Sequence, residues 1–120
     1  MEPCAFNYSL RVRLKKANSS FFGPGVADLL RLVDQTGSLQ TAAATMQMSY
    51  SKAWKIVRTA EKELGFSMME RHVGGAGGGS SQLTEQGRSF IERYERFQRE
   101  IYQTADKLFD KYFSGDDQTI

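Results

Sequence analysis

One side of a predicted helix over residues 50–64 carries the side chains whose types and spacing best suit chemistry. Its cations, Lys52, Lys55 and Arg58, recur every third residue, which keeps them on neighbouring parts of one helix face. Ammonium, guanidinium and hydroxyl groups donate hydrogen bonds, so such a face suits phosphate oxygens and the edges of bases. For an isolated helix, a merely solvated face would be the commoner interpretation, by roughly 3 to 1.

The segment before this helix favours a binding face. Ser38 is placed to cap a short alanine-rich helix, and Ser49 to cap the next helix after a turn over residues 46–48. A short capped helix, a tight turn and a second helix with a polar first turn are typical of a helix-turn-helix, which places that first turn against base edges. We therefore expect DNA contacts from Gln40, Thr41, Ser49, Tyr50, Ser51, Lys52, Lys55 and Arg58.

A glycine-rich run follows the predicted helix-turn-helix. Residues 68–83 are interpreted as two short strands, a wing, around a tip at residues 74–79. The run lacks the Gly-Lys-Ser/Thr ending of a P-loop and the Gly-x-Gly-x-x-Gly pattern of a dinucleotide loop. A tip without side chains lets its backbone approach DNA, although a plain mobile loop remains an alternative. The neighbouring basic side chains favour contact, and we expect it from Arg71, His72, Gly74 and Gly75.

Groups for catalysis or metal binding are scarce in this sequence. His72 is the only histidine and Cys4 the only cysteine, which leaves little material for a zinc site, a histidine-based triad or an internal disulfide. The sequence pairs no nucleophile with a base, and its carboxylates fall on predicted solvated helix faces. It therefore predicts a protein that is not an enzyme and that binds no metal and no cofactor.

The elements before the helix-turn-helix follow from alternation and from proline. Leu10, Val12 and Leu14 alternate with basic residues, which predicts a strand over residues 9–15 with one buried face. Residues 18–23 are predicted to form a turn. Pro24 is predicted to open a helix that ends at Gly37.

A last helix is predicted from its cap at Thr84 to about Phe113. Apolar and aromatic side chains recur along it at steps of three and four, and they form more apolar surface than one small domain needs to bury. An aromatic stripe more often belongs to a core than to a ligand site, and we interpret this one as a core shared between two chains. The predicted homodimer interface comprises Phe90, Tyr94, Phe97, Ile101, Leu108 and Tyr112.

Length and composition fit one globular domain, with 120 residues of which 40% are hydrophobic and 25% charged. We predict a mainly α fold with a small β-wing: a winged helix-turn-helix over residues 1–83, a long dimerisation helix of the same domain over residues 84–113, and a frayed tail over residues 114–120. Basic residues outnumber acidic ones in residues 1–65, and the balance reverses in residues 101–120, which favours nucleic acid at one end. No apolar run approaches a membrane span and no signal-peptide pattern opens the chain, so we expect a cytoplasmic protein with no membrane partner.

Several motifs resemble the N-terminal DNA-binding domain of the molybdate-responsive ModE family. They are Gly37-Ser38-Leu39, Ser49-Tyr50-Ser51-Lys52-Ala53-Trp54, Glu70-Arg71 with the glycine tip, and Leu83-Thr84-Glu85-Gln86-Gly87. The last motif, together with Glu63-Leu64-Gly65 and Glu70-Arg71, is also similar to the winged helix-turn-helix of LysR-type regulators. The Ser-Tyr-x-x-Ala-Trp motif and the glycine-rich wing favour the ModE side, and the resemblance covers residues 8–113.

This resemblance implies a dimeric transcriptional regulator that docks its third helix in the major groove. Tyr50, Ser51, Lys52 and Lys55 would then face bases or phosphates, and residues 71–75 would lie in the wing. ModE regulators usually carry an oxyanion-binding domain after the long helix, and this chain stops there. We therefore expect a ModE-like homodimer that lacks that domain.

The leading hypothesis is a sequence-specific double-stranded DNA-binding homodimer that regulates transcription. One alternative is a winged-helix protein–protein interaction module that uses the aromatic last helix, and steep salt dependence of duplex binding would argue against it. The other alternative is an oxyanion sensor in molybdenum metabolism, which basic residues near helix amino ends would support. A thermal shift with molybdate tests that sensor.

Overall fold

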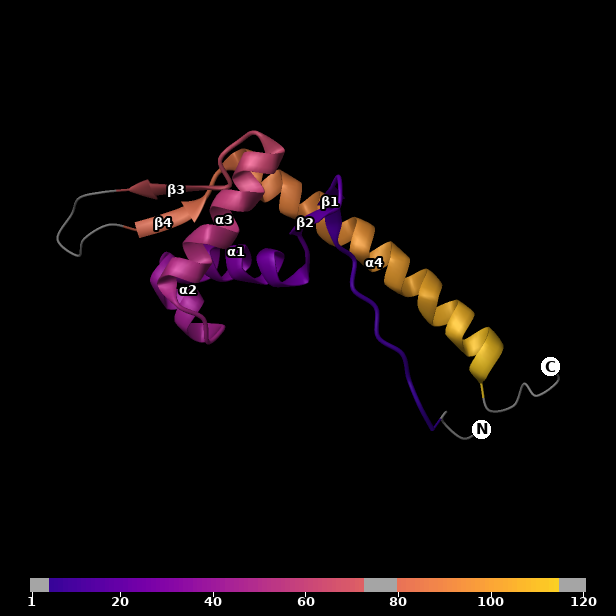
Figure 1. Ribbon diagram of the computed structural model, residues 1–120. Helices are drawn as coiled ribbons and strands as arrows, with labels where there is room; N and C mark the ends of the chain where they lie inside the picture. Colours follow the sequence, from indigo (N-terminus) through magenta and orange to yellow (C-terminus); the bar gives the residue numbers. More distant parts are fainter. Residues whose placement is uncertain (1–4, 73–79, 115–120) are drawn as a thin grey trace.

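The computed structural model describes residues 5–72 and 80–114, and in these ranges four helices accompany two small antiparallel sheets (Figure 1). In chain order the elements are β1 (Leu14–Lys16), β2 (Ser19–Phe22), α1 (Pro24–Thr36), α2 (Leu39–Thr45), α3 (Tyr50–Leu64), β3 (Met69–His72), β4 (Ser80–Leu83) and α4 (Glu85–Phe113). Strand β1 pairs with β2, and β3 pairs with β4. The predicted class, mainly α with a small β-wing, is confirmed. Within the described ranges, no helix is both long and apolar enough to cross a membrane.

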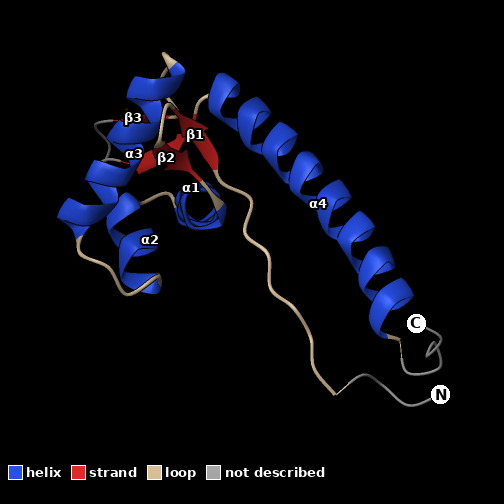
Figure 2. Ribbon diagram, turned by 45° about the vertical axis from the view of Figure 1, so that its right-hand side comes forward, coloured by secondary structure: helices blue, strands red, loops and turns tan. Residues whose placement is uncertain are grey.

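Helices α1, α2 and α3 pack around one apolar core, with α1 seen nearly end-on beside the other two in Figure 2. Leu29, Leu30 and Val33 of α1 are fully buried. The facing sides of α2 and α3 contribute mainly alanine, whose small side chain lets the helix backbones approach closely. This close approach fixes the angle at which α3 leaves the core.

Side-chain caps set the amino ends of α2 and α3, as predicted. The hydroxyl oxygen of Ser38 accepts a hydrogen bond from the backbone N–H of Thr41 at 3.0 Å. Ser49 accepts one from the backbone N–H of Lys52 at 3.1 Å. These bonds satisfy donors that a helix leaves free in its first turn. Helices α1 and α3 each end at the predicted glycine, which adopts a left-handed conformation with φ of 75° and 84°.

The predicted strand over residues 9–15 and the predicted turn over residues 18–23 are both wrong. Strand β1 begins only at Leu14, and Ser19–Phe22 forms its partner β2, so that the turn lies at Ala17 and Asn18. The alternation of apolar residues has another cause. Residues 5–13 form an extended N-terminal arm whose apolar side chains and backbone carbonyls face α4 instead of a neighbouring strand.

Two tyrosine hydroxyls of α4 hold the N-terminal arm. Tyr94 donates a hydrogen bond to the carbonyl oxygen of Val12 at 2.7 Å, and Tyr102 donates one to the carbonyl oxygen of Leu10 at 3.0 Å. Further along, the ring of Phe6 packs edge-on against aromatic rings in the last turns of α4. The arm therefore runs toward the carboxyl end of α4 (Figures 1 and 2).

The junction between the wing and α4 is tight. Thr84 caps α4, as predicted, by accepting a hydrogen bond from the backbone N–H of Gly87 at 2.9 Å, and its own N–H donates to the carbonyl oxygen of Met68 at 2.9 Å. A Cβ atom on Gly87 would lie 2.3 Å from that same carbonyl oxygen. Only glycine lets the first turn of α4 approach the backbone this closely.

A carboxylate of α1 joins the wing and α4 to the helical core. Asp34 Oδ1 accepts hydrogen bonds from the backbone N–H of Leu83 at 3.3 Å and from Arg88 Nη2 at 3.2 Å. Nearby, the N–H of Ser81 donates to the carbonyl oxygen of Gly37 at 2.8 Å. The hydrogen bond from Arg88 holds the pKa of Asp34 below its ordinary value, against the opposing effect of partial burial.

The first turns of α4 belong to the core of the chain itself. Phe90, Ile91 and Tyr94 are buried, and the ring of Phe22 lies 5.0 Å from the rings of both Phe90 and Tyr94. The prediction that Phe90 and Tyr94 form a dimer interface therefore needs correction, because the protomer already covers them. Beyond them the helix exposes large apolar side chains: Phe97 (51%), Leu108 (50%) and Tyr112 (62%).

Replacing Gly87 with alanine should destabilise the domain, because the new methyl group would overlap the carbonyl oxygen of Met68 and displace α4 or the wing. Overpacking of this kind costs about 1–3 kcal/mol, so the melting temperature by circular dichroism should fall by roughly 5–20 °C. Gly25→Ala is the matched control, since a Cβ there meets nothing within 4 Å. Equal melting of the two variants would contradict the close approach.

Asp34→Asn should weaken the dependence of stability on pH. Because the folded-state pKa of Asp34 is lowered, its contribution is fully present above the ordinary carboxyl pKa and is lost as pH falls through the folded-state value. The melting temperature of the wild type should therefore drop more steeply than that of the variant between about pH 5 and pH 2. Asp28→Asn, at an exposed position of the same helix, is the control variant. Parallel profiles for wild type and Asp34→Asn would disprove the role of this carboxylate.

Candidate nucleic-acid interface

Helix α3 separates its small buried residues from an outward polar face. Ala53, Val57 and Ala60 are fully buried against α1 and α2. The first turn of α3 contains no acidic residue, so its cations are not neutralised locally. The outward face, which is exposed throughout, comprises Ser51, Lys52, Lys55, Arg58, Thr59 and Lys62.

The acidic residues of α3 lie in its second half and are engaged elsewhere. A carboxylate oxygen of Glu61 accepts a hydrogen bond from the backbone N–H of Met68 at 2.8 Å, which fixes the chain between α3 and the wing. Glu63 pairs with Lys16 at 3.6 Å. The first half of the outward face therefore keeps its positive character.

The wing contacts one edge of this face. Arg71 Nη2 of β3 donates a hydrogen bond to the hydroxyl of Tyr50 at 3.4 Å. The ring of Tyr50 meets the half-buried Trp54 edge-on, and the guanidinium of Arg58 lies 5.4 Å from the centre of the Trp54 ring. Cation–π contact of this kind holds an arginine in place without removing its hydrogen-bond donors. The structure thus brings three predicted contact residues, Tyr50, Arg58 and Arg71, into one cluster around Trp54.

The other predicted wing residues divide between the described and undescribed parts of the chain. His72 ends β3, and its Nε2 lies 3.0 Å from the side-chain nitrogen of Gln82 on β4. Both side chains are exposed on the wing. Gly74 and Gly75 lie outside the described residues.

Helix α2 presents Gln40 and Thr41 to solvent in its first turn. The backbone N–H of Thr41 is held by the Ser38 cap, and its carbonyl oxygen accepts a hydrogen bond from the hydroxyl of Thr45 at 2.9 Å. Both side chains thus stand on a fixed helix end. The hydroxyl oxygen of Ser49 accepts the capping hydrogen bond of α3, which leaves its O–H as a donor.

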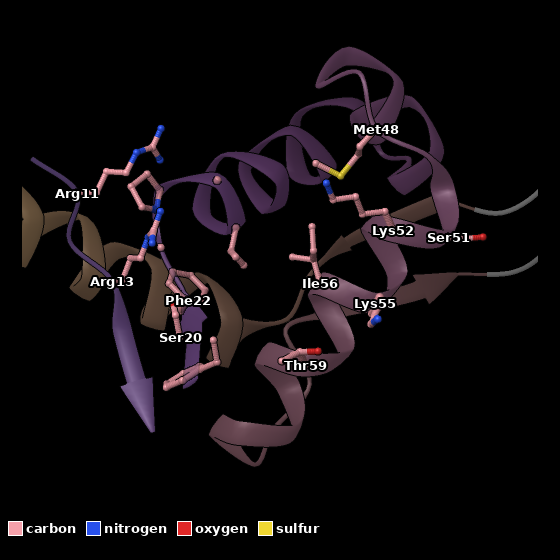
Figure 3. A pocket seen from close by; sticks show the side chains of 15 residues that line it. Arg11, Arg13, Ser20, Phe22, Met48, Ser51, Lys52, Lys55, Ile56 and Thr59 are labelled. Atoms are coloured by element: carbon pink, nitrogen blue, oxygen red, sulfur yellow. The ribbon is translucent and has the colours of Figure 1, made fainter. Parts of the chain in front are cut away.

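A cavity lies along the edge of α3 that is opposite the wing. This arm cavity, of about 810 Å³, is bounded by the N-terminal arm, β2, the first turn of α1 and α3. Arg11 and Arg13 stand on its arm side, while Lys52 extends into it from α3 and Ser51 points away (Figure 3). Lys55 is the fourth cation of its lining, and none of the described lining residues is acidic.

Sequence reasoning did not include Arg11 and Arg13 among the candidate site residues. Their alternation with Leu10, Val12 and Leu14 suggested the solvated face of a strand. No local signal marked them, because Arg11 and Arg13 reach the cavity only through the contacts that the arm makes with Tyr94 and Tyr102 of α4. In the described ranges, no cluster of three or more His, Cys, Asp or Glu side chains is placed to hold a metal ion.

A three-helix core, a tight turn between α2 and α3, and a two-stranded wing packed beside α3 define a winged helix-turn-helix domain. The family described as bacterial regulatory helix-turn-helix protein, lysR family, matches residues 27–88. The chain belongs to this family.

Curated relatives are ModE proteins. The chain is 31% identical to the DNA-binding transcriptional dual regulator ModE of Escherichia coli K12 over 87% of its own length. It is 28% identical to the transcriptional regulator ModE of Haemophilus influenzae over 78% of its length, and 30% identical to the molybdenum transport protein ModE of Azotobacter vinelandii over 69%. The chain spans 38%, 36% and 31% of the lengths of these three relatives.

Solved structures with the same fold come from CbnR. A crystal structure of the CbnR DNA-binding domain with DNA matches 69% of this chain and 90% of that chain, with a TM-score of 0.54 and 19% identity. Full-length CbnR with its target DNA matches 72% of this chain and 28% of that chain, with a TM-score of 0.55 and 20% identity. At this level of identity the likeness concerns the fold.

Proposed function

We propose that this chain is a sequence-specific, double-stranded DNA-binding module of a transcriptional regulator. The observation that carries the proposal is the exposed outward face of α3, where a capped first turn free of acidic residues presents hydroxyl and cationic donors. The relatives named as transcriptional regulators and the DNA complexes of CbnR support the same function. Helix α3 would enter the major groove with the wing beside it.

The positions along α3 divide the contacts by type. Tyr50, Ser51 and Lys52 lie in the first turn, where insertion into the groove brings side chains to base edges. Lys55 and Arg58 lie one and two turns further, where phosphates are the nearer partners. Arg71, hydrogen-bonded to Tyr50, would hold the wing at the adjoining backbone.

The proposed module acts as a homodimer through α4. This helix has 29 residues, and its side chains outside the core recur at steps of four, four, three and four, which is the seam pattern of paired helices. The N-terminal arm covers a neighbouring side of α4, on which Tyr102 and Phe109 lie. The seam left open comprises Phe97, Ile101, Ala105, Leu108 and Tyr112. Exposed apolar surface on this scale is typical of an interface.

Lys52→Ala should reduce discrimination between operator and scrambled duplex by about 1–3 kcal/mol, because a base contact is lost. Arg58→Ala should weaken both duplexes about equally and flatten the dependence of log K on log salt by about one unit, because a phosphate contact is lost. The measurement is fluorescence anisotropy with both duplexes at several salt concentrations, with the exposed Arg99→Ala on α4 as control. Wild-type behaviour of both α3 variants would remove α3 as the recognition helix.

Phe97→Glu combined with Ile101→Glu should abolish the dimer, because a paired seam would bury four carboxylates without partners. Sedimentation should give a folded monomer at concentrations where the wild type is a dimer, since Phe97 is exposed and Ile101 only half-buried in the protomer. Gln103→Glu, on the side of α4 away from the seam, is the control. A double variant that stays a folded dimer would place the interface elsewhere.

A further inference from the structure

The arm cavity combines an apolar floor with a cationic rim. Phe21, Val26, Met48 and Ile56 line it and are each only partly buried, so apolar surface remains open to solvent inside the cavity. Its volume of about 810 Å³ falls within the range of small-molecule sites. A concave apolar floor with a few convergent polar groups is the usual architecture of such sites.

The rim brings together four cations that lack acidic partners. Within residues 5–72 and 80–114 the ion pairs join Lys16 to Glu63, Arg31 to Glu95 and Arg88 to Asp34. None of these pairs includes a rim cation. Like charges at one site repel one another, and a bound anion relieves that repulsion. The rim cations are Arg11, Arg13, Lys52 and Lys55.

The fold fixes the backbone that carries the two arginines. The carbonyl oxygens of Leu10 and Val12, which flank Arg11, accept hydrogen bonds from Tyr102 and Tyr94. This clamp fixes the arm backbone at both sides of Arg11, so the arm side of the rim is placed at the cavity without a ligand. A rim that is already positioned loses less conformational entropy on binding.

The apolar floor distinguishes the expected ligand from DNA. A phosphodiester backbone presents its charged oxygens outermost, so it supplies negative charge but little apolar surface to cover the four floor side chains. Inorganic oxyanions share this lack. A ligand that removes the floor from water and places its charge at the rim satisfies both features of the cavity.

We propose that the arm cavity binds an organic carboxylate that has an apolar body, and that the bound anion weakens DNA binding. The first half of this inference stands on the cavity. The second half rests on the proposed function, because Lys52 and Lys55 belong to both the cavity rim and the DNA-facing side of α3. A carboxylate bound between them competes with phosphate for the same cations.

Calorimetric titration in the absence of DNA tests the site with 2-naphthoate as probe. The matched probes are 2-naphthamide, which keeps the apolar body without the charge, and inorganic phosphate, which keeps charge without the body. We expect 2-naphthoate to bind at least tenfold more tightly than either. If 2-naphthamide binds as tightly as 2-naphthoate, the cationic rim does not contribute to binding. If phosphate binds as tightly as 2-naphthoate, the apolar floor does not contribute. Either result overturns the proposal, as does the absence of naphthoate binding.

Gly25 provides a variant pair that places charge in the cavity. It lines the cavity in the first turn of α1, and a Cβ there meets nothing within 4 Å. An aspartate in a first helical turn is favourable for folding, so Gly25→Asp should fold and yet bind 2-naphthoate at least tenfold more weakly. The isosteric Gly25→Asn should retain most of the affinity. If neither Gly25 variant loses affinity for 2-naphthoate, or if both lose it equally, the site does not depend on charge and the proposal is contradicted. Arg11→Gln with Arg13→Gln should also weaken binding at least tenfold.

Fluorescence anisotropy with duplex DNA tests the competition separately. At about three times its wild-type Kd, 2-naphthoate should raise the Kd for duplex at least threefold in the wild type and in Gly25→Asn. The Kd for duplex of Gly25→Asp should rise less than about 1.5-fold under the same conditions. If naphthoate binds but the Kd for duplex stays the same, the competition is refuted. If no duplex binding occurs at all, the proposed function fails, while the calorimetric result still decides whether the cavity is a ligand site.

Discussion

The carboxylate of Asp34 is the constraint on which the relative placement of the parts depends. It accepts hydrogen bonds from the backbone of β4 and from Arg88 of α4, so one residue of α1 orients both elements that leave the helical core. A partly buried ion pair contributes little net free energy, but it penalises any arrangement that leaves one partner unpaired. Asp34 therefore specifies geometry more than it adds stability, and the close approach at Gly87 permits that geometry.

The outward face of α3 is a consequence of the alanines behind it. Small side chains in α2 and on the inner side of α3 let both helices sit close to α1, which leaves the polar side of α3 standing clear of the domain. The wing then returns to α3 through Glu61, which binds the backbone of Met68, and through Arg71, which binds Tyr50. Strand β3 and α3 thus form one continuous surface, and its cations are supplied by two different elements.

Features that depend on local sequence could be predicted. Serine and threonine caps, glycine helix ends and the apolar spacing of α1 are decided within a few residues, and the structure confirms them. The N-terminal arm could not, because the partners of its carbonyl oxygens lie more than 80 residues away in α4. Leu10 and Val12 alternate as in a strand, and sequence alone does not distinguish a neighbouring strand from a pair of tyrosine hydroxyls. The role of Asp34 is hidden for the same reason.

The aromatic excess of α4 has three separate explanations along one helix. Its first turns complete the protomer core through Phe90 and Tyr94, which removes these residues from any seam. A second side receives the N-terminal arm, whose Phe6 covers Phe109. The side around Phe97 and Leu108, which continues the face of Phe90 and Tyr94 beyond the core, remains open for the proposed partner chain. Because the arm and the proposed seam use neighbouring sides of the same helix, pairing of two chains would leave the arm docked and the arm cavity intact.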